Sequence, residues 1–111
     1  MKVRNLEHEP HPPKCTCENW LQHWENNSGK KAGTCSTFGC LQKAGVGGHV
    51  QKRDGSGDSW YIIPICKGCN SDLGQDYEVK DDTVFTLVCT TDQCGLHLIN
   101  KTLHEAGHFS R

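Results

Sequence analysis

The sequence predicts a small α+β domain whose apolar core is too thin to hold the fold by itself. The chain has 111 residues, the length of one domain. Leu, Ile, Val and Phe together number 21, a low share for a globular protein. The chain also has eight cysteines, which fall into four closely spaced pairs. We therefore expect the cysteines to supply part of the folding free energy.

The strands are expected in the second half of the chain. Residues 46–51, "VGGHVQ", and the apolar run 60–65, "WYIIPI", are expected to be strands. The polar, glycine-rich stretch 54–58 between them is a strong turn signal, so together they predict a β-hairpin. Residues 83–89, "TVFTLVC", predict an additional strand. Between these strands, residues 70–76 are expected to begin one or two helical turns.

Two further helices are expected to flank the strands. Trp20, Leu21 and Trp24 lie on one side of a short helix, and Gly29 can end it in a left-handed conformation. We expect the tryptophans to pack on the core rather than to face a partner. Apolar residues at helical spacing predict a terminal helix over residues 96–109.

Composition divides the chain into an arm and a domain. Residues 1–14 contain Pro10, Pro12 and Pro13 among mixed charges and predict a flexible arm, whereas residues 15–111 predict a single domain. The chain shows no apolar segment typical of a signal peptide or a membrane span. We expect no membrane partner and a cytoplasmic protein, in which thiols persist as metal ligands rather than as disulfides.

The charge pattern does not predict strong binding to nucleic acid. The formal net charge is -1 and the sequence pI is about 6.6, which argues against a protein that holds nucleic acid by bulk charge. Local basic clusters occur at Lys30–Lys31, Lys43 and Lys52–Arg53. Such clusters are more often a solvated surface than a binding surface.

One cysteine quartet has the spacing of a structural zinc site. Cys35 and Cys40 bracket a tight, glycine-containing knuckle, and Cys66 and Cys69 form a Cys-x-x-Cys pair. Two thiolates from each turn can complete a tetrahedral ion, whose binding supplies on the order of 10 kcal/mol of folding free energy. A knuckle, a hairpin and then a Cys-x-x-Cys that enters a helix is the order of a treble-clef zinc finger. Free or disulfide-bonded cysteines are the alternative.

The remaining cysteines predict a second zinc ion with a less definite ligand set. Cys15 and Cys17 can join Cys89 and Cys94 in a site that ties the start of the domain to the late strand. His23 can replace one of these cysteines as a ligand, although a single histidine on a helix is more often a core or surface side chain. One or two structural zinc ions are therefore expected.

Residues 35–70 resemble the HNH endonucleases, a family with a β-β-α fold that binds a catalytic metal. The resemblance is carried by His49 in "GGHV", by the apolar run "WYIIPI" that leads into "CKGCN", and by Asn70 at the end of that motif. It implies that His49 is the general base that activates water against a phosphodiester. It also implies that Asn70 is a ligand of a divalent cation such as Mg²⁺.

The chain departs from that family at two positions. Gly48 stands where the family places Asp or His as a metal ligand, and no Asn occupies the middle of the hairpin. With one good ligand a site would hold Mg²⁺ poorly. The sequence therefore predicts a zinc-binding, HNH-like module that binds DNA, RNA or a protein, with a divalent-metal-dependent endonuclease based on His49 as the alternative.

A second enzyme motif lies near the end of the chain. His104, Glu105 and His108 match the His-Glu-x-x-His pattern of zinc metallopeptidases. Those enzymes place their third ligand downstream, and only residues 109–111 follow here. A peptidase is thus a minor alternative, and a helix end, where histidines suit the negative pole of the helix dipole, is the simpler interpretation.

Overall fold

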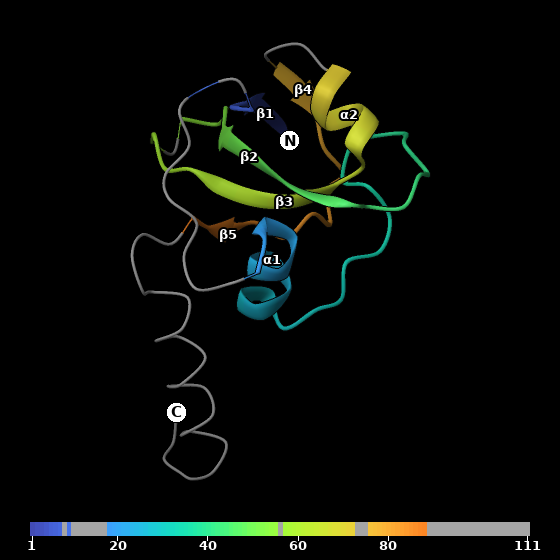
Figure 1. Ribbon diagram of the computed structural model, residues 1–111. Helices are drawn as coiled ribbons and strands as arrows, with labels where there is room; N and C mark the ends of the chain where they lie inside the picture. Colours follow the sequence, from blue (N-terminus) through green and yellow to red (C-terminus); the bar gives the residue numbers. More distant parts are fainter. Residues whose placement is uncertain (8, 10–17, 56, 73–75, 89–111) are drawn as a thin grey trace, which may run out of the picture.

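A five-stranded antiparallel sheet with the order β4-β1-β2-β3-β5 organises the computed structural model of the chain (Figure 1). The structure describes residues 1–7, 9, 18–55, 57–72 and 76–88. In chain order the elements are β1 (Lys2–Asn5), α1 (Trp20–Ser28), β2 (Val46–Lys52), β3 (Tyr61–Ile65), α2 (Lys67–Asp72), β4 (Asp76–Glu78) and β5 (Thr86–Leu87). The α+β class expected from the sequence is confirmed.

The predicted hairpin forms the centre of the sheet. β2 and β3 pair over five positions, from Val46 opposite Ile65 to Val50 opposite Tyr61. The turn between them contains Gly55 at φ 83° and Gly57 at φ 121°, a region of backbone conformation that glycine adopts without strain. The predicted turn thus joins the two strands that the sequence places on either side of it.

The two helices lie on opposite faces of the sheet, as Figure 1 shows. A β-carbon added at Gly47 would lie 2.5 Å from the carbonyl carbon of Trp20 in α1. A β-carbon at Gly48 would instead lie 3.0 Å from the side-chain oxygen of Asn70 in α2. Since consecutive residues of a strand point to opposite faces, β2 separates α1 from α2.

Helix α1 has a defined cap at each end. The Asn19 side chain accepts a hydrogen bond from the backbone N–H of Gln22 at 2.8 Å. At the other end Gly29 has φ 74°, and its N–H donates to the carbonyl of Glu25, so the predicted glycine stop is confirmed. Trp24 is buried, and its indole N–H donates to the carbonyl of Val84 at 2.7 Å.

The other face of the sheet carries the largest apolar cluster. Its members come from four strands, from residue 79 beyond β4, and from the loop before β2: Val3, Cys35, Val50, Ile63, Ile65, Tyr77 and Val79. Because Cys35 is among them and is fully buried, the cysteine-rich loop is part of the core rather than an appendage.

The beginning of the chain is ordered, whereas the sequence predicts a flexible arm over residues 1–14. Residues 2–5 form β1, which lies between β2 and β4 in the sheet. Val3 is fully buried, and the N-terminal ammonium group of Met1 lies 2.7 Å from a carboxylate oxygen of Glu78. The prolines that suggest an arm lie at positions 10, 12 and 13, after the residues that form β1. Residues 10–14 lie outside the described part of the chain.

Two other boundaries differ from expectation. Among the described residues of the predicted strand 83–89, only Thr86–Leu87 form a strand, β5. Its start is delayed by a turn in which the N–H of Thr83 donates to the carbonyl of Lys80. α2 begins at Lys67 rather than after Cys69, and β4 begins at Asp76, the last residue of the stretch expected to be helical. The terminal helix predicted over 96–109 lies outside the described residues. Among the residues described, no helix is long and apolar enough to cross a membrane.

The close contact between α1 and β2 predicts that two glycine-to-alanine substitutions differ in their effect on stability. Gly47→Ala should lower the free energy of unfolding by about 1–3 kcal/mol, because the added methyl group overlaps the backbone of α1. Gly45→Ala should change it little, since no atom lies within 4 Å of the added carbon. Urea unfolding of both variants measures the difference, and equal midpoints would contradict this packing.

Candidate metal centre

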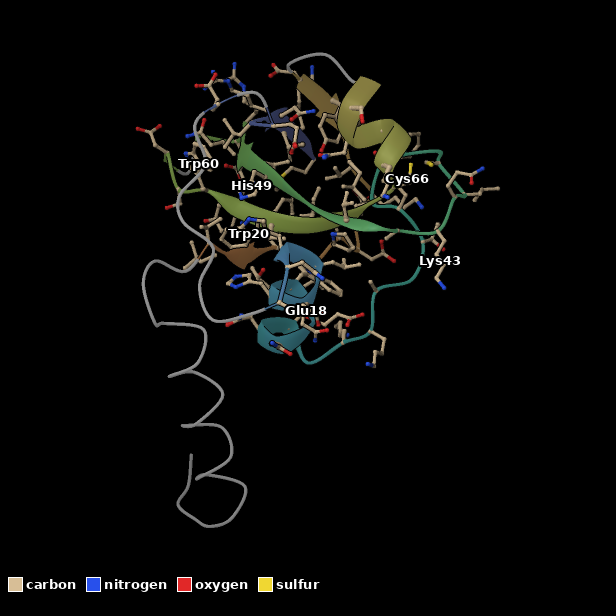
Figure 2. The ribbon with its side chains drawn as sticks, in the orientation of Figure 1. Glu18, Trp20, Lys43, His49, Trp60 and Cys66 are labelled. Carbon is tan, nitrogen blue, oxygen red and sulfur yellow. The ribbon has the colours of Figure 1, made fainter. Side chains whose placement is uncertain are left out.

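Four cysteines from two distant segments meet at one point on the face that carries α2. Cys35 and Cys40 lie in the loop between α1 and β2, and Cys69 lies within α2. Cys66, which is labelled in Figure 2, directly follows β3. Their sulfur atoms all lie within 4.8 Å of one another, and the Cys40 and Cys66 sulfurs are 4.0 Å apart. All four are free thiols. The quartet predicted from the sequence is therefore assembled.

Backbone hydrogen bonds shape the first half of the quartet. The N–H of Cys40 donates to the carbonyl of Thr37, and Gly39 at φ 82° allows this tight turn. Below the turn, the N–H of Cys35 donates to Gln42 at 2.8 Å, so the two arms of the loop run antiparallel. The result is the knuckle that the Cys-x₄-Cys spacing predicts.

The second half of the quartet depends on the junction of β3 and α2. The N–H of Asn70 donates to the carbonyl of Cys66, which makes Cys66 the residue before the helix. The N–H of Cys69 points at the Cys66 sulfur, 3.4 Å away. Such an N–H stabilises negative charge on the sulfur, as a metal-bound thiolate requires.

The geometry fits a tetrahedral ion. With zinc–sulfur bonds of about 2.3 Å, a regular tetrahedron places its sulfurs about 3.8 Å apart. The separations here, up to 4.8 Å, need only small side-chain rotations to reach that value. Four sulfur donors select a soft or borderline ion such as zinc over Mg²⁺ or Ca²⁺. The four cysteines can therefore bind a metal such as zinc.

The thiols titrate unequally. Burial raises the pKa of the Cys35 thiol, but hydrogen bonds from the Thr37 side chain and from backbone groups of Cys66 and Thr37 outweigh it and lower this pKa to about 7. For Cys69, burial raises the pKa to about 12, with neighbouring Cys66 and the charge of Cys35 acting in the same direction. Without a cation the quartet thus keeps at least one proton at neutral pH.

A lysine far away in the sequence closes the knuckle. The Lys80 ammonium donates hydrogen bonds to the backbone carbonyls of Cys35 and Cys40, each at 2.7 Å. Its backbone N–H also donates to Ser36. Lys80 thus holds both ends of the knuckle and places a positive charge beside four sulfurs that become anionic on metal binding. Sequence reasoning missed it, since a lone lysine 40 residues beyond Cys40 carries no local signal.

His49 lies on the other face of the sheet from the metal quartet. Its side chain is 1% exposed. The rings of Trp20 and Trp60 meet it edge-on, with centroids 4.8 and 5.8 Å away, and the three residues are labelled in Figure 2. These contacts place His49 within aromatic packing against α1.

The structure does not bring His49 and Asn70 together. Asn70 approaches β2 at Gly48, which offers only hydrogen and no ligand atom. His49 is the next residue and faces the opposite way. A cation beside Asn70 would therefore meet no side chain from position 48.

The other candidate ligands are placed only in part. His23 is fully buried, and its Nε2 lies 2.7 Å from the carbonyl oxygen of Leu87, so that nitrogen carries the proton and donates. This bond is typical of a core histidine. The other candidates lie outside the described residues: Cys15, Cys17, Cys89, Cys94, His104, Glu105 and His108.

Comparison with known proteins identifies no family or function for this chain. No known protein family, no curated protein and no solved structure matches this chain. The functional argument therefore depends on the residues and geometry of the chain itself.

The contacts of Lys80 predict an effect on metal binding. Lys80→Met should weaken zinc binding by about 10- to 100-fold, because it removes both hydrogen bonds to the knuckle and the charge beside the sulfurs. Competition with a chelator of known affinity measures the change. Lys31→Met is the matched control, since Lys31 is exposed and makes no such contacts. Equal affinities for the two variants would remove Lys80 from the site.

Proposed function

We propose that this protein is a zinc-binding module of treble-clef type that presents a folded surface to a nucleic acid or protein partner. The observation that carries the proposal is the convergence of Cys35, Cys40, Cys66 and Cys69 within 4.8 Å. Four thiols with no open position form a closed set, which is typical of a structural ion rather than a catalytic one.

The order of elements supports the treble-clef assignment. The knuckle is followed by the β2–β3 hairpin and then by α2, and the second pair of ligands lies where the hairpin enters the helix. This is also the order in HNH proteins, so the same observations support an HNH-like scaffold. The ion would join the loop before β2 to the start of α2, and it would compensate for the small number of large apolar residues.

The endonuclease alternative has weaker support. A general base must reach water and phosphate, yet His49 is enclosed by two tryptophans and lies across the sheet from Asn70. Position 48 offers no ligand for a divalent cation. The peptidase alternative depends on residues outside the described part of the chain, so no contact supports it.

A zinc titration of the metal-free, reduced protein tests the proposal. We expect tight binding with release of protons, because Cys69, with its raised pKa, is protonated at neutral pH and must lose that proton to bind zinc. Affinity should therefore rise with pH and fall in acid. Calorimetry in two buffers of different ionisation enthalpy measures the protons.

Cysteine variants assign the bound zinc to this quartet. Cys66→Ser should lose one equivalent of zinc and the cooperative thermal transition, whereas Ser71→Ala, at an exposed position of α2, should keep both. Undiminished zinc in Cys66→Ser, or a protein that binds no zinc, would contradict the proposal.

The placement of His49 also predicts the outcome of a cleavage assay. Supercoiled plasmid incubated with the zinc-loaded protein and Mg²⁺ or Mn²⁺ should remain intact, because no cation site adjoins His49 in the described residues. Metal-dependent nicking that persists through purification and disappears in His49→Gln, with zinc content unchanged, would restore the nuclease alternative.

A further inference from the structure

Charge is unevenly divided between the metal-binding segments and the rest of the chain. Residues 26–53 and 59–71, which carry the quartet, contain none of the 13 Asp and Glu residues. They contain half of the 12 Lys and Arg residues: Lys30, Lys31, Lys43, Lys52, Arg53 and Lys67. A near-neutral chain thus has one strongly basic part.

Four of these six cations have no carboxylate partner in the part of the chain that the structure describes. Lys52 lies over the rings of Tyr61 and Phe85, and Arg53 pairs with Asp76 at 3.5 Å. The other four are exposed, and within the described residues none forms an ion pair with a carboxylate: Lys30, Lys31, Lys43 and Lys67. A zinc ion with four thiolates carries two negative charges, and Lys80 already compensates one of them. A positive surplus therefore remains at the surface.

The same loop exposes apolar side chains. Phe38, between the first two ligands, is 70% exposed, and Leu41, directly after Cys40, is 88% exposed. In a chain with few large apolar residues, two exposed ones on a metal-fixed turn leave apolar area in water unless a partner covers it. Removal of the metal would release the turn that holds both.

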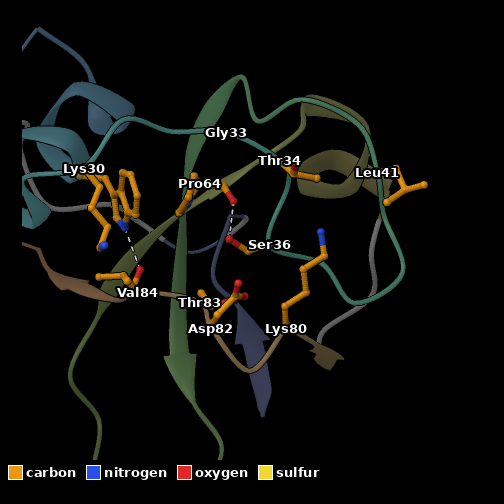
Figure 3. Close-up of a pocket in the computed structure, with 11 residues that line it drawn as sticks. Lys30, Gly33, Thr34, Ser36, Leu41, Pro64, Lys80, Asp82, Thr83 and Val84 are labelled. Carbon is orange, nitrogen blue, oxygen red and sulfur yellow. Dashed lines mark hydrogen bonds between the residues drawn. The ribbon is translucent and has the colours of Figure 1, made fainter.

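A hollow of about 550 Å³ adjoins the knuckle (Figure 3). Leu41, Pro64 and Val84 supply apolar walls. The charged residues of the lining are Lys30, Lys80 and Asp82, so cations outnumber the single carboxylate. Thr34 also lines it and is paired with Lys43 across the two arms of the loop, so the two side chains leave the backbone on the same side. A hollow with apolar walls, of a size typical of ligand sites, thus lies beside Lys30 and Lys43 and has one carboxylate on its border.

From these observations we propose that the knuckle and its adjoining hollow bind single-stranded nucleic acid. The lysines contact successive phosphates, an unpaired base stacks on Phe38, and the hollow admits a neighbouring base. A single strand fits better than a duplex because its bases are free to meet exposed apolar side chains. All four free cations are lysines, which bind phosphate as point charges, so recognition is largely independent of sequence.

This inference rests on the proposed function, because Phe38 lies on the turn between two of the proposed zinc ligands. Fluorescence anisotropy with labelled oligo-dT and oligo-U of about 12 nucleotides tests it, on protein whose zinc content has been measured. If four lysines contact phosphates, affinity should fall about 50-fold between roughly 50 and 200 mM salt. Binding of either oligonucleotide supports the proposal, and the preferred one identifies the source of the strand.

Variants locate the surface. Phe38→Ala should weaken binding by roughly 5- to 150-fold, as expected for the loss of one stacked base, whereas Leu87→Ala, which is also exposed, should not. The triple change Lys30→Gln, Lys31→Gln, Lys43→Gln should lower the salt slope by about 2. Lys2→Gln, an exposed lysine outside the basic segments, is its control.

Several results would overturn the inference. They are zinc-loaded protein that binds neither oligonucleotide at low salt, Phe38→Ala that binds as tightly as Leu87→Ala, or a labelled poly-glutamate peptide that binds where oligonucleotides do not. The last result would assign the surface to an acidic protein. If the protein still contains zinc in these cases, the proposed metal site stands and only the nucleic-acid proposal is wrong. If the protein contains no zinc, the proposed metal site itself is wrong.

Discussion

The approach of the knuckle to the start of α2, through four cysteine sulfurs, is the constraint on which most of this structure depends. The knuckle is also tied by hydrogen bonds to the sheet. Ser36 donates through both its N–H and its hydroxyl to the carbonyl of Pro64 in β3, and Phe38 donates to Glu78 in β4. Three segments that are remote in sequence thus meet where an ion can hold them. Loss of that junction would release an edge strand and a helix together.

A lysine stabilises the knuckle on one face of the sheet, and close helix packing stabilises the other face. Lys80 fixes the knuckle carbonyls and supplies positive charge where thiolates form. On the opposite face of the sheet, Gly47 lets α1 approach the backbone of β2 directly. Each face of a small sheet is thereby covered by a different means. Helix α1 covers one face at close range. The knuckle and α2, which a metal ion can join, cover the other face.

Residues 48 and 49 of β2 face opposite sides of the sheet, which separates their surroundings. A hairpin that enters a Cys-x-x-Cys helix places one strand residue toward α2 and the next away from it. In this chain the first is Gly48, which makes room for Asn70, and the second is His49, which fills aromatic packing against α1.

The sequence by itself determined the features whose causes are local. Cys-x₄-Cys and Cys-x-x-Cys spacing, the glycine-rich turn of the hairpin and Gly29 at the end of α1 each act over a few residues, and each was predicted from those residues. The tertiary structure alone decided what depends on distant partners. β1 and β4 have no strong pattern of their own, and they are strands because Val3 and Tyr77 pair across the chain and bury their side chains together. The role of Lys80 and the separation of His49 from Asn70 likewise follow from non-local pairing and from the alternation of side chains across the sheet. Neither leaves a local trace in the sequence.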